Sequence, residues 1–118
     1  MAKIRISIVF ECGARIGPGK AALLESIRNT GSISAAAREI GMDYKRAWTL
    51  LDSMNQAFTE PVVSAAPGGA RGGGAVLTEF GAEVLERYRS IQERATAIAA
   101  EDMTALKRRA RPDAGPKV

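Results

Sequence analysis

Residues 34–54 read SAAAREIGMDYKRAWTLLDSM, and this stretch decides the fold that we expect. Ser34 is a good N-cap for a short helix that stops at Gly41, and Asp43 is a good N-cap for a second helix. Two helices joined by a turn of about three or four residues that contains glycine form a helix-turn-helix. The apolar side chains on these two helices are Ala36, Ala37, Ile40, Ala47, Leu50, Leu51 and Met54.

The residues before this pair predict a strand and a helix. Apolar side chains recur at every second residue from Ile4 to Phe10, which is the period of a half-buried strand, and residues 12–17 turn the chain. Pro18 suits the first position of a helix, because its missing N–H costs nothing there. The helix ends at Gly31, a typical stop signal. Its apolar stripe consists of Ala21, Leu23, Leu24 and Ile27.

The residues after Asn55 are typical of a β-hairpin. Residues 60–63 favour a strand entered through proline, and residues 75–77 favour its return partner. Between them, residues 67–74 form a glycine-rich tip with Arg71 at its centre. The expected fold class is therefore mainly α with a small β wing, namely a winged helix-turn-helix followed by a long helix.

That last helix is expected to run from Glu79 to about Lys107, with Thr78 as its N-cap. Its apolar residues are spaced by four, four, three, four and three, which is close to a coiled-coil seam. A helix of this length cannot bury itself against so small a body, so we expect a homodimer. The predicted dimer interface consists of Phe80, Val84, Tyr88, Ile91, Ala95 and Ile98.

The helix-turn-helix predicts double-stranded DNA as the partner. The second helix of such a motif enters the major groove with its N-terminal residues nearest the base edges. Side chains opposite Ala47 and Leu51 face outward on that helix and can reach phosphates or bases. For Trp48 a place in the core is an equal alternative, because tryptophan is highly buried on average. The predicted DNA-binding residues are Ser34, Tyr44, Lys45, Arg46, Trp48, Thr49 and Arg71.

Arg71 belongs to this set because glycines on both sides would let the backbone lie close to DNA. Arginine is attracted by the negative potential of a narrow minor groove. The equal alternative is a mobile loop that has no partner.

The composition argues against a metal site and against an enzyme. Cys12 is the single cysteine, so it cannot form an internal disulfide, and the chain has no histidine for a zinc site or for general base catalysis. Residues 14–21 resemble a nucleotide-binding P-loop, but alanines replace its first glycine and its magnesium-binding hydroxyl. Pro18 also removes one amide donor from that loop. We therefore expect no catalytic residues, no cofactor and no metal.

The charges are unevenly distributed along the chain. Residues 1–46 carry eight basic and four acidic side chains, residues 47–106 carry four basic and eight acidic ones, and residues 107–118 carry five basic and one acidic. Such segments suggest surfaces with different functions. We expect a DNA-binding domain over residues 1–78, a dimerisation helix over 79–106 and a disordered basic tail over 107–118. Without a signal peptide or a membrane span, the expected location is the cytoplasm.

Several separate motifs together resemble the DNA-binding half of the ModE-type molybdate-responsive regulators, which is similar to the winged helix of the LysR-type regulators. The resemblance covers residues 3–100 and implies a homodimer that is held by the last helix and reads a palindromic operator. The motifs that carry it are residues 17–20, 31–34 with 36–37, 44–48, 54–55, and 72–78 with Gly81.

Two departures from this family matter. Asp43 stands where the family often has serine, which adds a negative charge near DNA. The full-length regulators also continue into a molybdate-binding module, whereas this chain ends at Val118. We therefore expect a stand-alone form that has no molybdate site. The alternative function is a protein-interaction module that docks a partner through the long acidic helix.

Overall fold

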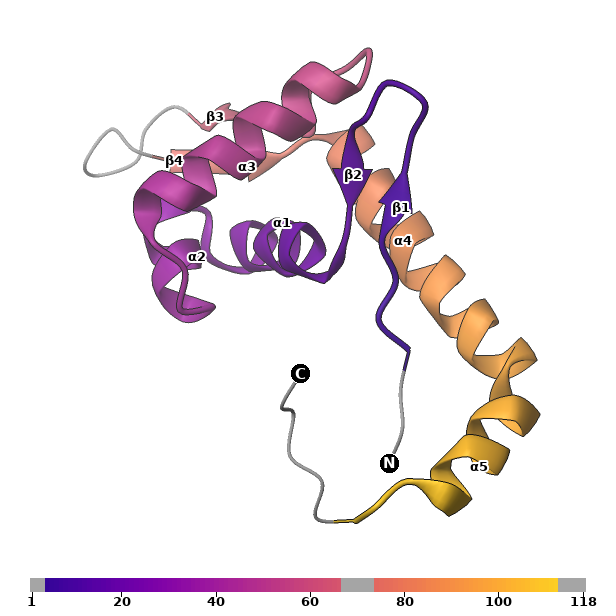
Figure 1. Cartoon of the computed structure of the whole chain (residues 1–118). Coiled ribbons are helices and arrows are strands. Elements are labelled where there is room, and N and C mark those ends of the chain that lie inside the picture. Colours follow the sequence, from indigo (N-terminus) through magenta and orange to yellow (C-terminus); the bar gives the residue numbers. More distant parts are fainter. Residues whose placement is uncertain (1–3, 67–73, 113–118) are drawn as a thin grey trace.

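A computed structural model describes residues 4–66 and 74–112 of the chain. Helices α1 to α3 and the start of α4 surround one core, while the rest of α4 and α5 extend away from it (Figure 1). In order, the elements are β1 (Ile8–Val9), β2 (Arg15–Ile16), α1 (Pro18–Thr30), α2 (Ile33–Glu39), α3 (Tyr44–Ala57), β3 (Val63–Ala66), β4 (Gly74–Leu77), α4 (Glu79–Ile98) and α5 (Ala100–Arg109).

Helix α1 runs through the centre of the core, and its expected stripe is buried. Pro18 occupies the first helical position, and Gly31 ends the helix with a φ of 70°, a left-handed conformation that glycine adopts without strain. Among the described residues, Ser26 is the buried polar side chain of the core: its hydroxyl donates to the Glu39 carboxylate, with the carbonyl oxygen of Ala36 as a second, longer acceptor at 3.3 Å. These bonds fix α1 against α2.

The helix-turn-helix is present, but the predicted cap of its first helix is wrong. Ser32, not Ser34, is the N-cap of α2: its side chain accepts a hydrogen bond from the backbone N–H of Ala35 at 3.1 Å. The chain at Ser32 is extended, as a cap requires, whereas Ser34 lies one residue inside the helix and is exposed. Asp43 precedes α3 as expected, although its side chain makes no capping hydrogen bond.

The wing is a two-stranded antiparallel hairpin in which Val63 pairs with Leu77 and Ala66 with Gly74. Its first strand begins at Val63 rather than at residue 60 as predicted. The backbone N–H of Val62 donates instead to the side chain of Asn55 at 2.7 Å, so it takes no part in the ladder. Most of the predicted glycine-rich tip, residues 67–73, lies outside the described residues.

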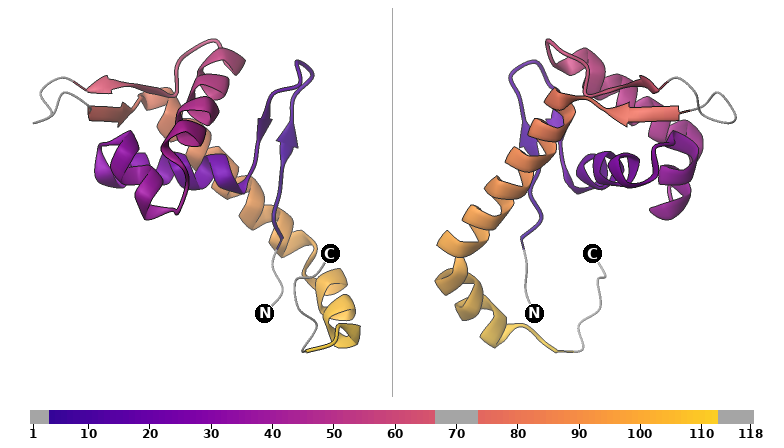
Figure 2. Two further views of the ribbon diagram at one scale, coloured as in Figure 1. Left: turned by 60° about the vertical axis from the view of Figure 1, so that its left-hand side comes forward. Right: turned by 180° about the vertical axis from the view of Figure 1, so that it is seen from behind.

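At the N-terminus, the predicted strand over residues 4–10 pairs only at Ile8 and Val9, with the short strand β2 that the sequence did not reveal. The predicted alternation is nonetheless visible, because Ile4, Ile6 and Ile8 are half-buried while the residues between them are exposed. This segment lies along α4 (Figure 2). The Tyr88 hydroxyl donates to the carbonyl oxygen of Ile6 at 2.7 Å.

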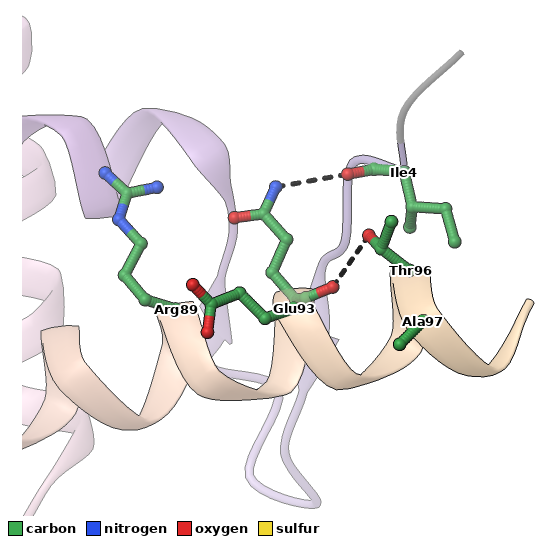
Figure 3. Close-up of a pocket in the computed structure, with 6 residues that line it drawn as sticks. Ile4, Arg89, Glu93, Thr96 and Ala97 are labelled. Atoms are coloured by element: carbon green, nitrogen blue, oxygen red, sulfur yellow. Dashed lines mark hydrogen bonds between the residues drawn. The ribbon is translucent and has the colours of Figure 1, made fainter. Parts of the chain in front are cut away.

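A second hydrogen bond holds the start of this segment, at Ile4, against α4. The side-chain amide of Gln92 donates to the carbonyl oxygen of Ile4 at 3.1 Å. Beside this bond lies a shallow groove (Figure 3), whose lining residues are Ile4, Arg89, Gln92, Glu93, Thr96 and Ala97. The N-terminal segment is therefore fixed to α4 by side chains that donate to its backbone.

Helix α4 begins as predicted, because the Thr78 side chain accepts a hydrogen bond from the backbone N–H of Gly81 at 2.9 Å. Gly81 itself allows α4 to approach the wing, since a Cβ at this position would overlap the carbonyl oxygen of Val62. The prediction of one helix up to residue 107 is wrong. The helix is interrupted at Ala99, and α5 starts afresh with Glu101 and Asp102 in its first turn, where acidic side chains are favourable.

Helix α5 has no buried residue. Among the residues that the structure describes, no helix is long and apolar enough to span a membrane.

Candidate nucleic-acid interface

The outer face of α3 gathers most of the predicted DNA-binding residues. Ala47, Leu51 and Met54 are buried against the core, which turns the opposite side of the helix toward solvent. Two of the exposed residues are cationic, two are aromatic and one is a threonine. They are Tyr44, Lys45, Arg46, Trp48 and Thr49.

Trp48 was open to two interpretations, and the structure places it on the surface. Half of its surface is exposed (50%), as is that of Tyr44 (51%). The indole N–H of Trp48 donates to the Tyr44 hydroxyl oxygen at 2.7 Å, so the two rings form a linked pair one helical turn apart. Large aromatic side chains at this exposure are unusual for a free surface and are typical of binding sites.

Thr49 has a local partner for its hydroxyl, which donates to the carbonyl oxygen of Lys45 at 3.1 Å. Its oxygen and its methyl group remain on the exposed side of α3. Ser34 is exposed in the first turn of α2, the other helix of the motif. Arg71 lies outside the described residues.

The wing is fixed relative to α3 by Asn55. Its side-chain oxygen accepts from the N–H of Val62, and its amide donates to the carbonyl oxygen of Val63 at 3.2 Å. On the other side of the wing, the N–H of Ala75 donates to the carbonyl oxygen of Gly31 at 3.0 Å. The start of α3 therefore lies on the same side of the molecule as the end of the hairpin where Ala66 pairs with Gly74, and this side is opposite α5 (Figure 1).

The predicted dimer residues on α4 do not share one environment. Tyr88 is 2% exposed and belongs to the core of its own chain, so its side chain offers almost no surface to a partner. Phe80, Val84 and Ala95 are half-buried. Ile91 is 43% exposed and Ile98 is 88% exposed, and these two offer the most surface to a partner.

Next to these residues the surface has an apolar groove of about 260 Å³. Three aromatic rings follow one another along it: Phe10 contacts Phe58 edge to face with centroids 5.6 Å apart, and Phe58 contacts Phe80 in the same way at 5.3 Å. The remaining lining residues are Ile8, Ile16, Glu83, Val84, Arg87, Tyr88 and Ile91.

The residues that raised the question of a P-loop are arranged differently from a phosphate site. The Lys20 ammonium donates to the carbonyl oxygen of Arg15 at 2.7 Å, within its own chain. Partial burial, together with the nearby Arg15 charge, lowers the pKa of Lys20. The described part of the chain has no cluster of three potential metal ligands, and Cys12 is exposed in the turn of the first hairpin.

We compared the chain with known proteins. No family model matches it. It is 54% identical over 80 residues to the molybdenum-pterin-binding protein MopB of Rhodobacter capsulatus, an alignment that covers 68% of this chain and 30% of MopB. It is 39% identical over 88 residues to the DNA-binding transcriptional dual regulator ModE of Escherichia coli K12, with 72% of this chain and 34% of ModE covered.

A third relative is the molybdenum transport protein ModE of Azotobacter vinelandii, 36% identical over 75% of this chain and 33% of that protein. This chain is a homologue of the ModE and Mop proteins. It spans about a third of the length of these relatives. The resemblance predicted from the sequence motifs is thereby confirmed.

The solved structures confirm the fold of this ModE homologue. The DNA-binding domain of CbnR, crystallised with DNA, superposes with a TM-score of 0.58 at 17% identity, covering 75% of this chain and 95% of that domain. At this identity the likeness concerns the fold alone, which is a winged helix.

Asn55 is the residue whose importance the sequence alone did not reveal. In the sequence, Asn55 is only one residue of a motif. In the structure, its side chain makes the contact between α3 and the wing. A signal was available, because an asparagine at the end of a helix just before a hairpin can bond to nearby backbone groups.

Proposed function

We propose that this chain is a sequence-specific DNA-binding transcription regulator that acts as a homodimer, with the start of α3 in the major groove. The observation that carries the proposal is the exposed face of α3, where two cations and a linked aromatic pair lie at the end of the helix that a helix-turn-helix presents to DNA. The ModE relative named as a DNA-binding transcriptional dual regulator supports the same function.

The side chains divide into two groups by chemistry. Tyr44, Lys45, Trp48 and Thr49 are proposed to contact base edges, so they set which sequences bind. Arg46, and Arg71 from the glycine-rich tip, are proposed to contact phosphates or the minor groove, so they strengthen binding to every sequence.

The proposed homodimer uses the exposed residues on α4 and the groove beside them. Ile91 and Ile98 are exposed large apolar side chains, and a second copy would cover them. Two copies would place two α3 helices on one face of the duplex, so the operator should contain two half-sites about one helical turn apart.

DNA binding is tested first with a duplex that the protein selects from a random pool, and with a scrambled version of that duplex. Promoters of molybdenum transport genes are natural further probes, given the name of one relative. Affinity is measured by fluorescence anisotropy across a salt series. Lys45→Ala should weaken the free energy of binding to the selected duplex by about 1–3 kcal/mol. Arg46→Ala should weaken both duplexes and lower the salt slope by about one.

Gln56→Ala is the matched control, since it removes an exposed side chain at the far end of the same helix. It should bind both duplexes as the wild type does. If Lys45→Ala and Arg46→Ala also bind like the wild type, α3 does not contact DNA, and the alternative of a protein-interaction module replaces this function.

The homodimer is tested by sedimentation equilibrium. Replacing Ile91 and Ile98 by Asp should give a monomer, because burying unpaired charge in an interface is costly. Arg94→Asp, on an exposed position of the same helix, is the control for added negative charge. A wild type that sediments as a monomer at micromolar concentration contradicts this part of the proposal.

A further inference from the structure

The aromatic pair on α3 has a hydrogen-bonding arrangement that limits what each partner can offer to a ligand. Tyr44 and Trp48 lie four residues apart, so their side chains share one side of the helix. Both are half exposed, and they are joined by a bond of 2.7 Å from the indole N–H to the phenol oxygen.

An indole has one polar hydrogen, and in Trp48 it is already used. Trp48 therefore presents only its carbon edge and face to an approaching molecule. A phenol has one hydrogen to donate and two lone pairs that accept. In Tyr44 one lone pair is filled by the indole, while the hydroxyl hydrogen has no acceptor among the residues that the structure describes.

We propose that Trp48 positions the Tyr44 hydroxyl so that it donates a hydrogen bond to an acceptor atom of duplex DNA. This inference rests on the DNA-binding function proposed above and assigns Tyr44 as a contact residue and Trp48 as its positioning residue. The acceptor is a phosphate oxygen or a base atom such as guanine N7 or thymine O4, which share the same chemistry.

Two physical effects make the pair a better donor than a tyrosine alone. The bond from Trp48 restricts the rotation of the exposed phenol before DNA arrives, so less conformational entropy is lost on binding. A hydroxyl that accepts one hydrogen bond also becomes a stronger donor, because bonds in a chain polarise one another.

The test is a double-mutant cycle on the full chain with the selected duplex, using Tyr44→Phe, Trp48→Phe and both together. Tyr44→Phe removes the donor and should lower affinity about threefold to tenfold. Trp48→Phe keeps an aromatic ring but removes the indole N–H, so it should weaken the wild type at least about twofold more than it weakens the Tyr44→Phe variant. Any apolar contact of residue 48 is lost in both backgrounds and cancels.

The scrambled duplex identifies the acceptor. A Tyr44→Phe loss on both duplexes assigns a phosphate, and a loss on the selected duplex alone assigns a base; either result supports the proposal. Circular dichroism should show equal folding of all four proteins. Gln56→Ala removes another exposed hydrogen bond between residues one turn apart on α3, the bond from Gln56 to Asp52, and should leave affinity unchanged.

Two results overturn the inference. One is a cycle in which the two substitutions are additive, and the other is an unchanged affinity of Tyr44→Phe on both duplexes. If Lys45→Ala still weakens binding in that case, the DNA-binding function stands without this inference. If the wild type selects no duplex at all, both fall together.

Discussion

Helices α3 and α4 are both amphipathic, and the same kind of pattern has a different outcome in each. In α3 the apolar residues at Ala47, Leu51 and Met54 are buried in the core, as their spacing predicts. In α4 the apolar spacing predicted contacts with a second copy, but Tyr88 of that pattern is buried in the core of its own chain. Only the outer part of the pattern, at Ile91 and Ile98, remains exposed.

The difference shows what hydrophobic periodicity measures. A repeat of apolar residues states that one side of a helix will be covered, and it does not state by which chain. Helix α3 is short, and its apolar side packs against the core of its own chain. Helix α4 is longer: its first part packs against that core, and its later part leaves Ile91 and Ile98 exposed for a partner. The following predictions test how much the contacts of α3 and α4 within the chain contribute to its stability.

The largest effect is expected where α4 approaches the wing. Gly81→Ala places a Cβ against the carbonyl oxygen of Val62, and neither backbone can move freely, so the free energy of unfolding should fall by about 3 kcal/mol. Gly19→Ala is the matched control, because it is also a helical glycine but has open space around it. It should be neutral or stabilise by up to about 1 kcal/mol. Urea unfolding measures both, and equal effects would contradict the close approach.

The next effect concerns the far end of α3. Asn55→Asp keeps the oxygen that accepts from Val62 but turns a second oxygen toward the carbonyl of Val63, so stability should fall by about 2 kcal/mol. Gln56→Glu adds the same charge one residue away on the exposed side, and should cost only a few tenths of a kcal/mol. Similar losses in the two proteins would show that charge, and not the wing contact, is responsible.

A smaller effect is expected at Tyr88, in the middle of α4, whose hydroxyl bonds to the N-terminal segment. Tyr88→Phe removes the hydrogen bond to the carbonyl oxygen of Ile6, and the expected loss of stability is about 1 kcal/mol. Thermal unfolding in comparison with Tyr44→Phe, on the exposed face of α3, provides the measurement. No difference between the two would show that the bond to Ile6 does not stabilise the fold.

The smallest effects are expected for the two ion pairs of α4. Arg87 pairs with Glu83 within the helix at 2.8 Å and is largely exposed, and Arg89 pairs with Glu25 of α1 at 2.6 Å. The Glu83 carboxylate raises the pKa of Arg87, but water screens an exposed pair, so urea unfolding should show no measurable change in stability for Arg87→Ala. Arg89→Ala should cost up to about 1 kcal/mol. A larger loss for Arg87→Ala would reverse this order.

The sequence predicted most of the fold because local signals were strong. Pro18 begins α1 and Gly31 ends it, Thr78 caps α4, and α3 has the expected buried side. The wrong cap of α2 arose where two signals compete within a few residues. Ser32 and Ser34 are both good caps, and only the extended backbone at Ser32 decides between them.

The candidate site was predicted less completely, for a different physical reason. Helical spacing places Trp48 opposite the buried side of α3, but the usual burial of tryptophan left a place in the core open, and only the structure decides between the two. The bond between Trp48 and Tyr44 depends on the rotamers of both rings. Likewise, the role of Asn55 required the position of the wing, which is set by residues far along the chain.

The carbonyl oxygen of Gly31 has a consequence for how the domain tolerates changes of length. The same residue ends α1 and accepts the N–H of Ala75 in the wing. An insertion of one residue into α1 would turn its end by about 100°, since a helix has 3.6 residues per turn, and the wing would lose its acceptor. Insertions should therefore be excluded from α1.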